Sequence, residues 1–153
     1  MSPKLLLPNK FKKIGWFLLI PATLLGIFMT ATDFEISWLN VKVFALFNDN
    51  QSFSFINDNI TNEVVGVFFI IGALFVGFSK EKREDEFIAN LRLSSLLWAV
   101  YVNYILLLLS FLFVYGTAFF SVMMYNMFTV MVIFIVRFNY ILYKNSKSAP
   151  DEK

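Results

Sequence analysis

Four long apolar runs divide the chain, and polar segments separate them. The runs cover about residues 12–31, 62–79, 93–115 and 119–143. An α-helix needs roughly 20 apolar residues to cross the hydrocarbon core of a bilayer. The pattern therefore predicts an all-α membrane protein with four transmembrane helices, in which residues 1–153 form a single membrane domain.

The first run follows several lysines, an arrangement that is also typical of a signal peptide. No small-x-small cleavage site follows the run, and three more apolar runs come later in the chain. We therefore expect a retained transmembrane helix. Pro21 should kink this helix, because proline removes one of its hydrogen bonds.

The polar segment at residues 32–62 is expected to be an outer loop. Its Ile36–Phe47 stretch is β-branched and aromatic without clean alternation, so it fits either a short strand or a segment at the membrane interface. The interfacial interpretation is favoured because Trp38 and the nearby phenylalanines suit the headgroup region. The sequence that follows, Phe47–Ser52, is rich in Asn and Asp and predicts a turn.

The most strongly charged segment, residues 80–92, separates the second run from the third. It mixes four acids with four bases, and apolar residues follow at helical spacing. We expect a short amphipathic linker helix with its apolar face on the membrane surface. Residues 144–153 should form a polar, frayed tail.

The distribution of basic residues predicts the topology. Of the 13 Lys and Arg residues, 12 lie before the first run, around the linker, or near and beyond the end of the fourth run. Only Lys42 lies in the outer loop. Because basic residues are retained on the cytoplasmic side, the helices should form two antiparallel hairpins with an N-in/C-in topology. The chain should therefore cross its membrane as a multi-pass protein.

The composition narrows the chemistry. The chain is 58% hydrophobic and 16% charged, whereas a soluble domain is about 45–50% apolar and about 25% charged. It contains no Cys and no His, so thiol chemistry and the commonest metal ligand and general base are missing. No catalytic motif is present. We expect no enzyme activity, no cofactor and no metal. A net charge of +2 does not indicate nucleic acid binding.

The polar side chains deepest in the third and fourth runs are Asn103 and Asn126, with Ser110 and Thr129. If the chain folds back at Thr117, Asn103 lies nearest to Thr129, and Asn126 lies nearest to Ser110. Hydrogen bonds within these pairs would join the two helices with about 0.6–2 kcal/mol each. A polar path for a solute is the less favoured interpretation.

Small residues predict a contact between the first two helices. In antiparallel helices, Ala22 would lie level with Gly72, and Gly26 would lie near Gly66. The spacing of Ala73–Gly77 also fits a small-x-x-x-small contact, which lets two helix backbones approach closely. The alternative is that these residues reflect only the abundance of Gly and Ala in membrane helices.

Two charged features have competing interpretations. Arg137 lies near the cytoplasmic end of the fourth run, so an interfacial anchor is favoured over a site for a lipid headgroup or ligand. The acidic cluster Glu84–Glu86 could attract a divalent cation. Four bases surround these acids, which favours a solvated, self-neutralising helix start.

Three segments of the second half resemble an uncharacterised family of small bacterial four-helix integral membrane proteins. They are EKREDEFIANLRLSS, YVNYILLLL and YNMFTVMVIFIVRFNYILY. The earlier segments WLNVKVFALF and NITNE are similar more loosely. The resemblance implies this architecture in a bacterial inner (cytoplasmic) membrane, and it carries no catalytic or cofactor-binding residues over to this chain.

Two functions fit these observations, and the lipid bilayer is a partner in both. The favoured hypothesis is a non-enzymatic accessory, sensor or regulatory subunit that docks a protein partner through a charged cytosolic face. The residues expected to form that face are Glu84, Asp85, Glu86, Arg92 and Arg137. The alternative is a small pore or transporter, in which a homo-oligomer lines a cavity with the polar residues of the third and fourth helices.

Overall fold

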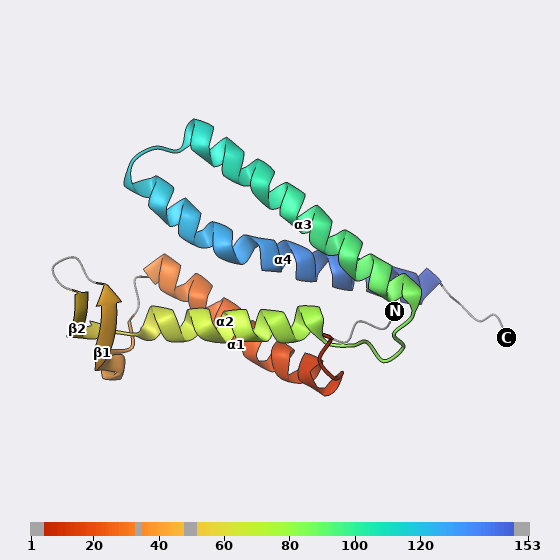
Figure 1. Cartoon of the computed structure of the whole chain (residues 1–153), viewed down its shortest axis with the longest axis horizontal. Helices are drawn as coiled ribbons and strands as arrows, with labels where there is room; N and C mark the ends of the chain where they lie inside the picture. Colours follow the sequence, from red (N-terminus) through yellow and green to blue (C-terminus); the bar gives the residue numbers. More distant parts are fainter. Residues whose placement is uncertain (1–4, 33–34, 48–51, 149–153) are drawn as a thin grey trace. The chain divides into compact units, whose positions relative to one another are not determined.

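The computed structural model describes residues 5–32, 35–47 and 52–148. The chain is mostly helical, with one pair of strands (Figure 1). In order, the elements are α1 (Lys10–Thr32), a 3-10 turn (Ser37–Leu39), β1 (Asn40–Phe47), β2 (Ser52–Asn59), α2 (Thr61–Phe78), α3 (Glu86–Phe113) and α4 (Thr117–Ser148).

Each of the four α-helices is long and apolar enough to cross a membrane. In the most apolar stretch of each helix, few residues are buried inside the protein: 22%, 33%, 11% and 11% for α1 to α4. Apolar surface on this scale needs an apolar partner, and the acyl chains of a bilayer provide one. The prediction of a mostly helical chain with four helices able to span a membrane is confirmed.

The helix boundaries differ from expectation around the linker. α3 begins at Glu86 and continues unbroken to Phe113, so residues 79–85 connect α2 to α3 without forming the helix expected over 80–92. Asp85 sets this boundary, because its carboxylate accepts a hydrogen bond from the N–H of Ile88 at 2.9 Å and caps the helix. At the other end, α4 extends to Ser148, so part of the expected polar tail is helical.

The chain forms two compact units. The first unit consists of Met1–Trp16 and Ala73–Lys153, and it holds the linker, α3, α4 and the adjoining ends of α1 and α2. The second unit is Phe17–Gly72, which holds both strands and the remainder of α1 and α2. All the residues of the expected docking face lie in the first unit.

A β-hairpin occupies the second unit, so most of Ile36–Phe47 forms the short strand that was the less favoured of the two interpretations. β1 and β2 are antiparallel, and Phe44 pairs with Phe55 in the register. Their ring centroids lie 5.3 Å apart, and the ring of Phe53 lies 6.4 Å from that of Phe44. Cross-strand aromatic pairs of this kind stabilise a hairpin. The turn expected between the strands falls largely on residues 48–51, outside the described residues.

The base of the hairpin is braced to the start of α2. Thr61 is 1% exposed, and its hydroxyl accepts a hydrogen bond from the N–H of Ile36 at 3.1 Å while donating one to the amide oxygen of Asn59. The amide nitrogen of Asn59 donates to the carbonyl of Ile36 at 3.1 Å. These bonds satisfy buried polar groups at the point where the strands meet the helix.

In the first unit, α3 and α4 lie side by side (Figure 1). The turn between them includes Gly116, whose φ of 73° is a conformation that glycine adopts readily. The core of this unit contains Phe134 and Phe138 of α4, which are both fully buried. The ring of Phe78, at the end of α2, packs on Phe134 with 5.6 Å between centroids.

Two glycines of the predicted small-residue contacts have different surroundings. A Cβ on Gly26 would lie 3.7 Å from Val65, next to the expected partner Gly66, which is an ordinary contact distance. A Cβ on Gly77 would lie only 2.6 Å from the ring of Phe134. Gly77 therefore makes room for a core aromatic of α4, a contact that the spacing of small residues did not reveal.

Gly77→Ala should destabilise the protein by about 1–3 kcal/mol, because the methyl group overpacks a buried aromatic cluster. Gly26→Ala is the matched control: its methyl group has room, and the higher helix propensity of alanine should leave stability unchanged or slightly raised. SDS-induced unfolding of the purified protein, followed by tryptophan fluorescence, measures both effects. Equal midpoints for Gly77→Ala and wild type would contradict the packing described here.

Candidate functional site

The segment before α1 holds the start of the linker in place. The N–H of Leu7 donates to the carbonyl of Phe78 at 3.0 Å, and the N–H of Lys80 donates to the carbonyl of Leu7 at 2.8 Å. The side-chain amide of Asn9 adds a hydrogen bond to the carbonyl of Lys80 at 2.7 Å. Backbone bonds on both sides of Ser79 therefore fix the exit of the chain from α2.

The guanidinium of Arg92 is the centre of the charged end of the first unit. Arg92 lies near the start of α3 and is only 6% exposed. Its Nη1 and Nη2 donate to the two carboxylate oxygens of Glu84 at 2.6 and 3.3 Å, and Nη2 also donates to the carbonyl of Ser79 at 3.2 Å. The guanidinium lies 5.1 Å from the ring centroid of Phe138. Arg92 thus connects the linker, α3 and α4.

The surroundings of the Glu84 carboxylate stabilise its ionised form. Burial alone would raise its pKa, but the hydrogen bonds from Arg92 and from the N–H of Glu81, with the positive charges of Arg92 and Lys80, lower it below the ordinary value. The N–H of Glu81 lies 2.9 Å from Glu84 Oε2. Glu84 is therefore ionised at neutral pH and compensates the buried guanidinium.

A second ion pair connects the first turn of α1 to the linker. Lys12 pairs with Glu81, and their side chains are 16% and 12% exposed. The ammonium nitrogen of Lys12 lies 6.0 Å from the ring centroid of Phe138, which Arg92 also approaches. Cations at such distances are attracted to the face of an aromatic ring. One buried phenylalanine therefore has two cations near it, each neutralised by a linker carboxylate.

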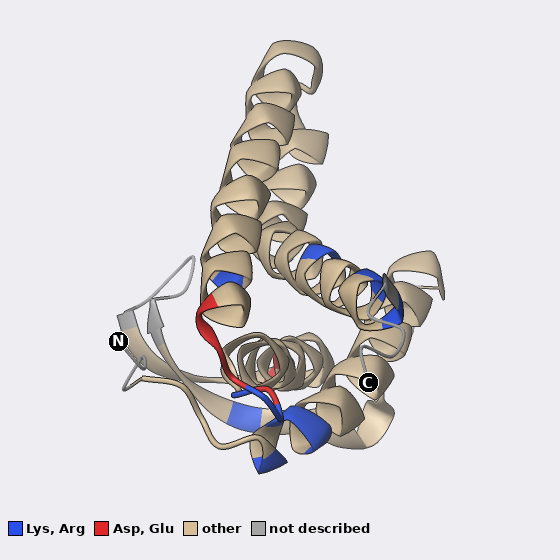
Figure 2. Ribbon diagram, turned by 90° about the vertical axis from the view of Figure 1, so that its right-hand side faces the viewer, with Lys and Arg blue, Asp and Glu red and all other residues tan. Residues whose placement is uncertain are grey.

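The residues predicted to form the docking face have different roles. Glu84 and Arg92 are bonded to each other and are largely buried, so they stabilise the linker and are not available to a partner. Asp85 is exposed but caps α3. Glu86 is exposed in the first turn of α3 and forms no ion pair among the residues that the structure describes. Figure 2 shows these acids leading directly into α3, with basic residues nearby.

Among the described residues, no ion pair links Arg137 to this cluster. Its guanidinium carbon lies 4.5 Å from the ring of Trp98, which is 12 residues after Glu86 on α3. At a rise of 1.5 Å per residue, Trp98 is about 18 Å along the helix from Glu86. A guanidinium stacked on a tryptophan gains a favourable cation–π interaction. This contact fits the interfacial anchor expected of Arg137.

The polar residues inside α3 and α4 pair differently from expectation. The side-chain amides of Asn103 and Asn126 exchange two hydrogen bonds, at 3.0 and 3.1 Å. Asn103 was expected opposite Thr129, and the difference arises in the turn. α4 begins at Thr117 itself, so the chain reverses at residues 114–116, before the expected point. When the centre of a turn moves by one residue, the residue that faces a given position on the other helix changes by two.

The two remaining polar residues bond within their own helices. Ser110 donates to the carbonyl of Leu106 at 2.9 Å, and Thr129 donates to the carbonyl of Tyr125 at 2.9 Å. Bonding of a hydroxyl to a carbonyl one turn back is a common way to satisfy it inside an apolar helix. The predicted pairs Asn103–Thr129 and Asn126–Ser110 were therefore wrong, although the polar link between the two helices is present.

Three contributors to the site were missed by sequence reasoning: Lys12, Glu81 and Phe138. On the sequence alone, Lys12 indicates only the topology, and Glu81 is only one member of a charged segment. The attraction between a basic segment before α1 and acids in the linker was a usable signal, because the predicted topology places both on the same side of the membrane. Phe138 has no such signal, since its neighbours come from distant parts of the chain.

Nothing in the described part of the chain gathers three or more His, Cys, Asp or Glu side chains as a metal site would require. The acids of the linker are instead distributed among ion pairs, a helix cap and solvent. Their arrangement is suited to holding the linker and presenting charge.

Comparisons of the chain with protein-family models, with curated proteins and with solved structures found no match. The class of protein is therefore described from its own fold and site alone. The protein is mostly helical, has four helices able to cross a membrane, and carries a partly buried charged cluster centred on Arg92.

Glu84→Gln should destabilise the protein at pH 7 by about 1–3 kcal/mol, because it leaves a buried guanidinium without its counter-charge. The pH dependence should also change. Since the folded-state pKa of Glu84 is lowered, its stabilising effect is full above the ordinary glutamate pKa of about 4.3. It is lost as the pH falls through the lower folded-state pKa. The wild type should lose this stability in acid, and Glu84→Gln should lose less.

Unfolding midpoints in detergent between pH 7 and acid pH measure both effects. Glu63→Gln is the control, because Glu63 is an exposed acid in the first turn of α2. If the unfolding midpoints of Glu84→Gln coincide with those of the wild type at every pH, the ion pair does not contribute to stability.

Proposed function

We propose that this protein is a non-enzymatic accessory, sensor or regulatory subunit of a bacterial cytoplasmic membrane, with a protein-docking surface on its cytosolic side. In this proposal α1–α2 and α3–α4 are two antiparallel transmembrane hairpins, and both termini are cytoplasmic. The position of 12 of the 13 basic residues supports this orientation. Membership of the four-helix family that the second half resembles is part of the same proposal.

The observation that carries the proposal is how the charged linker is held. Ion pairs at Glu81 and Glu84 and backbone bonds at Leu7 tether the connection between α2 and α3. A loop that only connects two membrane helices does not need ion pairs and backbone hydrogen bonds to fix its conformation. Pre-organised surfaces bind partners with a smaller loss of conformational entropy. The bracing therefore supports a role for this surface in recognition.

The start of α3 is the best candidate for the docking surface. Asp85, Glu86, Phe87 and Asn90 are exposed there, and the side chain of Phe87 is 53% exposed. Acids next to an exposed aromatic side chain suit a partner that presents basic residues around an apolar pocket. This surface replaces the five-residue set predicted from the sequence, from which only Asp85 and Glu86 remain.

The absence of Cys and His from the whole chain supports a non-enzymatic role. The alternative, a pore lined by the polar residues of α3 and α4, receives less support. Asn103 is 3% exposed, and it exchanges hydrogen bonds with Asn126 of the same chain. An amide pair that satisfies itself within one protomer is not available to line a shared cavity.

Charge reversal at Glu86 tests the docking surface. Affinity purification from native membranes in mild detergent, with quantitative mass spectrometry, should identify a stoichiometric partner. Glu86→Lys should reduce its recovery about tenfold or more, because like charges across an interface are strongly unfavourable. Glu63→Lys makes the same change in the first turn of α2, and it should leave recovery unchanged.

Three results would contradict the proposal. One is a preparation that contains only this chain as a homo-oligomer, which would favour the pore. Another is a partner recovered with Glu86→Lys as fully as with the wild type. The third is a loss of partner that is equal for Glu86→Lys and Glu63→Lys.

A further inference from the structure

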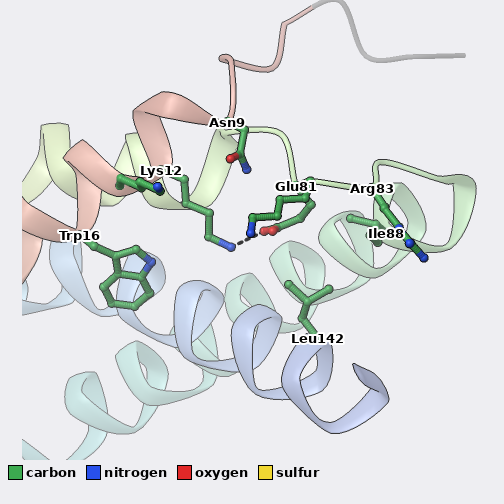
Figure 3. A pocket seen from close by; sticks show the side chains of 9 residues that line it. Asn9, Lys12, Trp16, Glu81, Arg83, Ile88 and Leu142 are labelled. Atoms are coloured by element: carbon green, nitrogen blue, oxygen red, sulfur yellow. Dashed lines mark hydrogen bonds and ion pairs between the residues drawn. The ribbon is translucent and has the colours of Figure 1, made fainter. Parts of the chain in front are cut away.

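A pocket of about 520 Å³ lies beside the Lys12–Glu81 ion pair in the first unit (Figure 3). Three parts of the chain line it: the start of α1, the linker with the first turn of α3, and the end of α4. The pocket does not include Glu86 or the other residues of the docking surface, so it is a separate feature of the same unit.

The polar wall of this pocket is strongly basic. Four bases line it, Lys12, Lys13, Lys82 and Arg83, and Glu81 is the one acid among its lining residues. Lys12 is paired with Glu81, whereas the other three bases are exposed and form no ion pair among the described residues. Four cations against one carboxylate leave an excess of three positive charges, so the pocket attracts anions.

Apart from Asn9, the rest of the lining is apolar. Trp16 from α1, Ile88 from α3 and Leu142 from α4 contribute it, and Figure 3 shows Leu142 directed from α4 toward the linker. Ile88 is 8% exposed. A simple inorganic anion has no apolar part that could pack against such a surface. A ligand with an anionic head and an apolar body would satisfy both kinds of wall.

We propose that this pocket binds the phosphodiester headgroup of an anionic glycerophospholipid, with the upper acyl region against Trp16 and Leu142. Lys82, Arg83 and Lys13 bind the phosphate oxygens, and the amide of Asn9 lies at the same pocket. The inference rests on the proposed orientation, which places the linker at the cytosolic surface. Basic pockets between membrane helices on that side are typical sites for anionic headgroups, and tryptophan suits the headgroup depth.

Lipid binding to the purified full-length protein tests the proposal. Native mass spectrometry from detergent would count bound molecules of dioleoylphosphatidylglycerol and, separately, of dioleoylphosphatidylcholine, which has the same acyl chains and no net charge. The wild type should retain phosphatidylglycerol in preference to phosphatidylcholine. Excess inorganic phosphate should not displace it, because free phosphate cannot use the apolar wall.

The double variant Lys82→Gln/Arg83→Gln removes two exposed charges that form no ion pair in the described structure. It should weaken phosphatidylglycerol binding about tenfold. Lys144→Gln/Lys147→Gln removes the same charge from exposed positions on the last part of α4, outside the pocket lining. This control should bind within about twofold of the wild type. Circular dichroism spectra that match the wild type would establish that each variant is folded.

Several outcomes would overturn the lipid assignment. Equal retention of the two lipids would show that charge is not recognised. Displacement by inorganic phosphate would identify a site for soluble phosphate compounds. Equal losses in the two double variants would place binding outside the pocket, as would no loss in either. These results are independent of Glu86→Lys, so failure of the lipid site and failure of the partner-docking surface are distinguishable.

Discussion

A buried positive charge constrains the whole charged end of this protein. The guanidinium of Arg92 has left bulk water, and a buried charge without a partner costs several kcal/mol. The linker must therefore place Glu84 and the carbonyl of Ser79 against it, while α4 must place the ring of Phe138 beside it. The path from α2 to α3 and the position of α4 within the first unit both follow from this requirement.

The same requirement determines what remains exposed. Charges that neutralise Arg92 and Lys12 are unavailable to other molecules. The charges that stay exposed in this unit include the acids at the start of α3 and the bases Lys13, Lys82 and Arg83 at the pocket. A surface with separate acidic and basic parts suits a basic protein segment and an anionic headgroup at the same membrane face. This separation links the proposed partner to the proposed lipid.

The four helices could be predicted because length and hydropathy are local properties of the sequence. The exposure of individual charged side chains could not be predicted, because the burial of Arg92 depends on Phe138, which is 46 residues away in the sequence. The first strand and the turn after it were open possibilities, but the pairing with β2 was not predicted, because the aromatic face of Phe44, Phe53 and Phe55 becomes evident only when two strands are paired in register. The Asn103–Asn126 pair was missed because a small displacement of the turn changes which residues face each other.

The most direct test is the sidedness of the linker. The chain has no native Cys, so single cysteines can be placed at Lys82 in the linker and at Asn57 in β2, both of which are exposed. A membrane-impermeant maleimide added to intact spheroplasts should label Asn57→Cys and leave Lys82→Cys unlabelled until the membrane is opened. Labelling of Lys82→Cys in intact spheroplasts would contradict the cytosolic position of the charged end and, with it, both proposed binding surfaces.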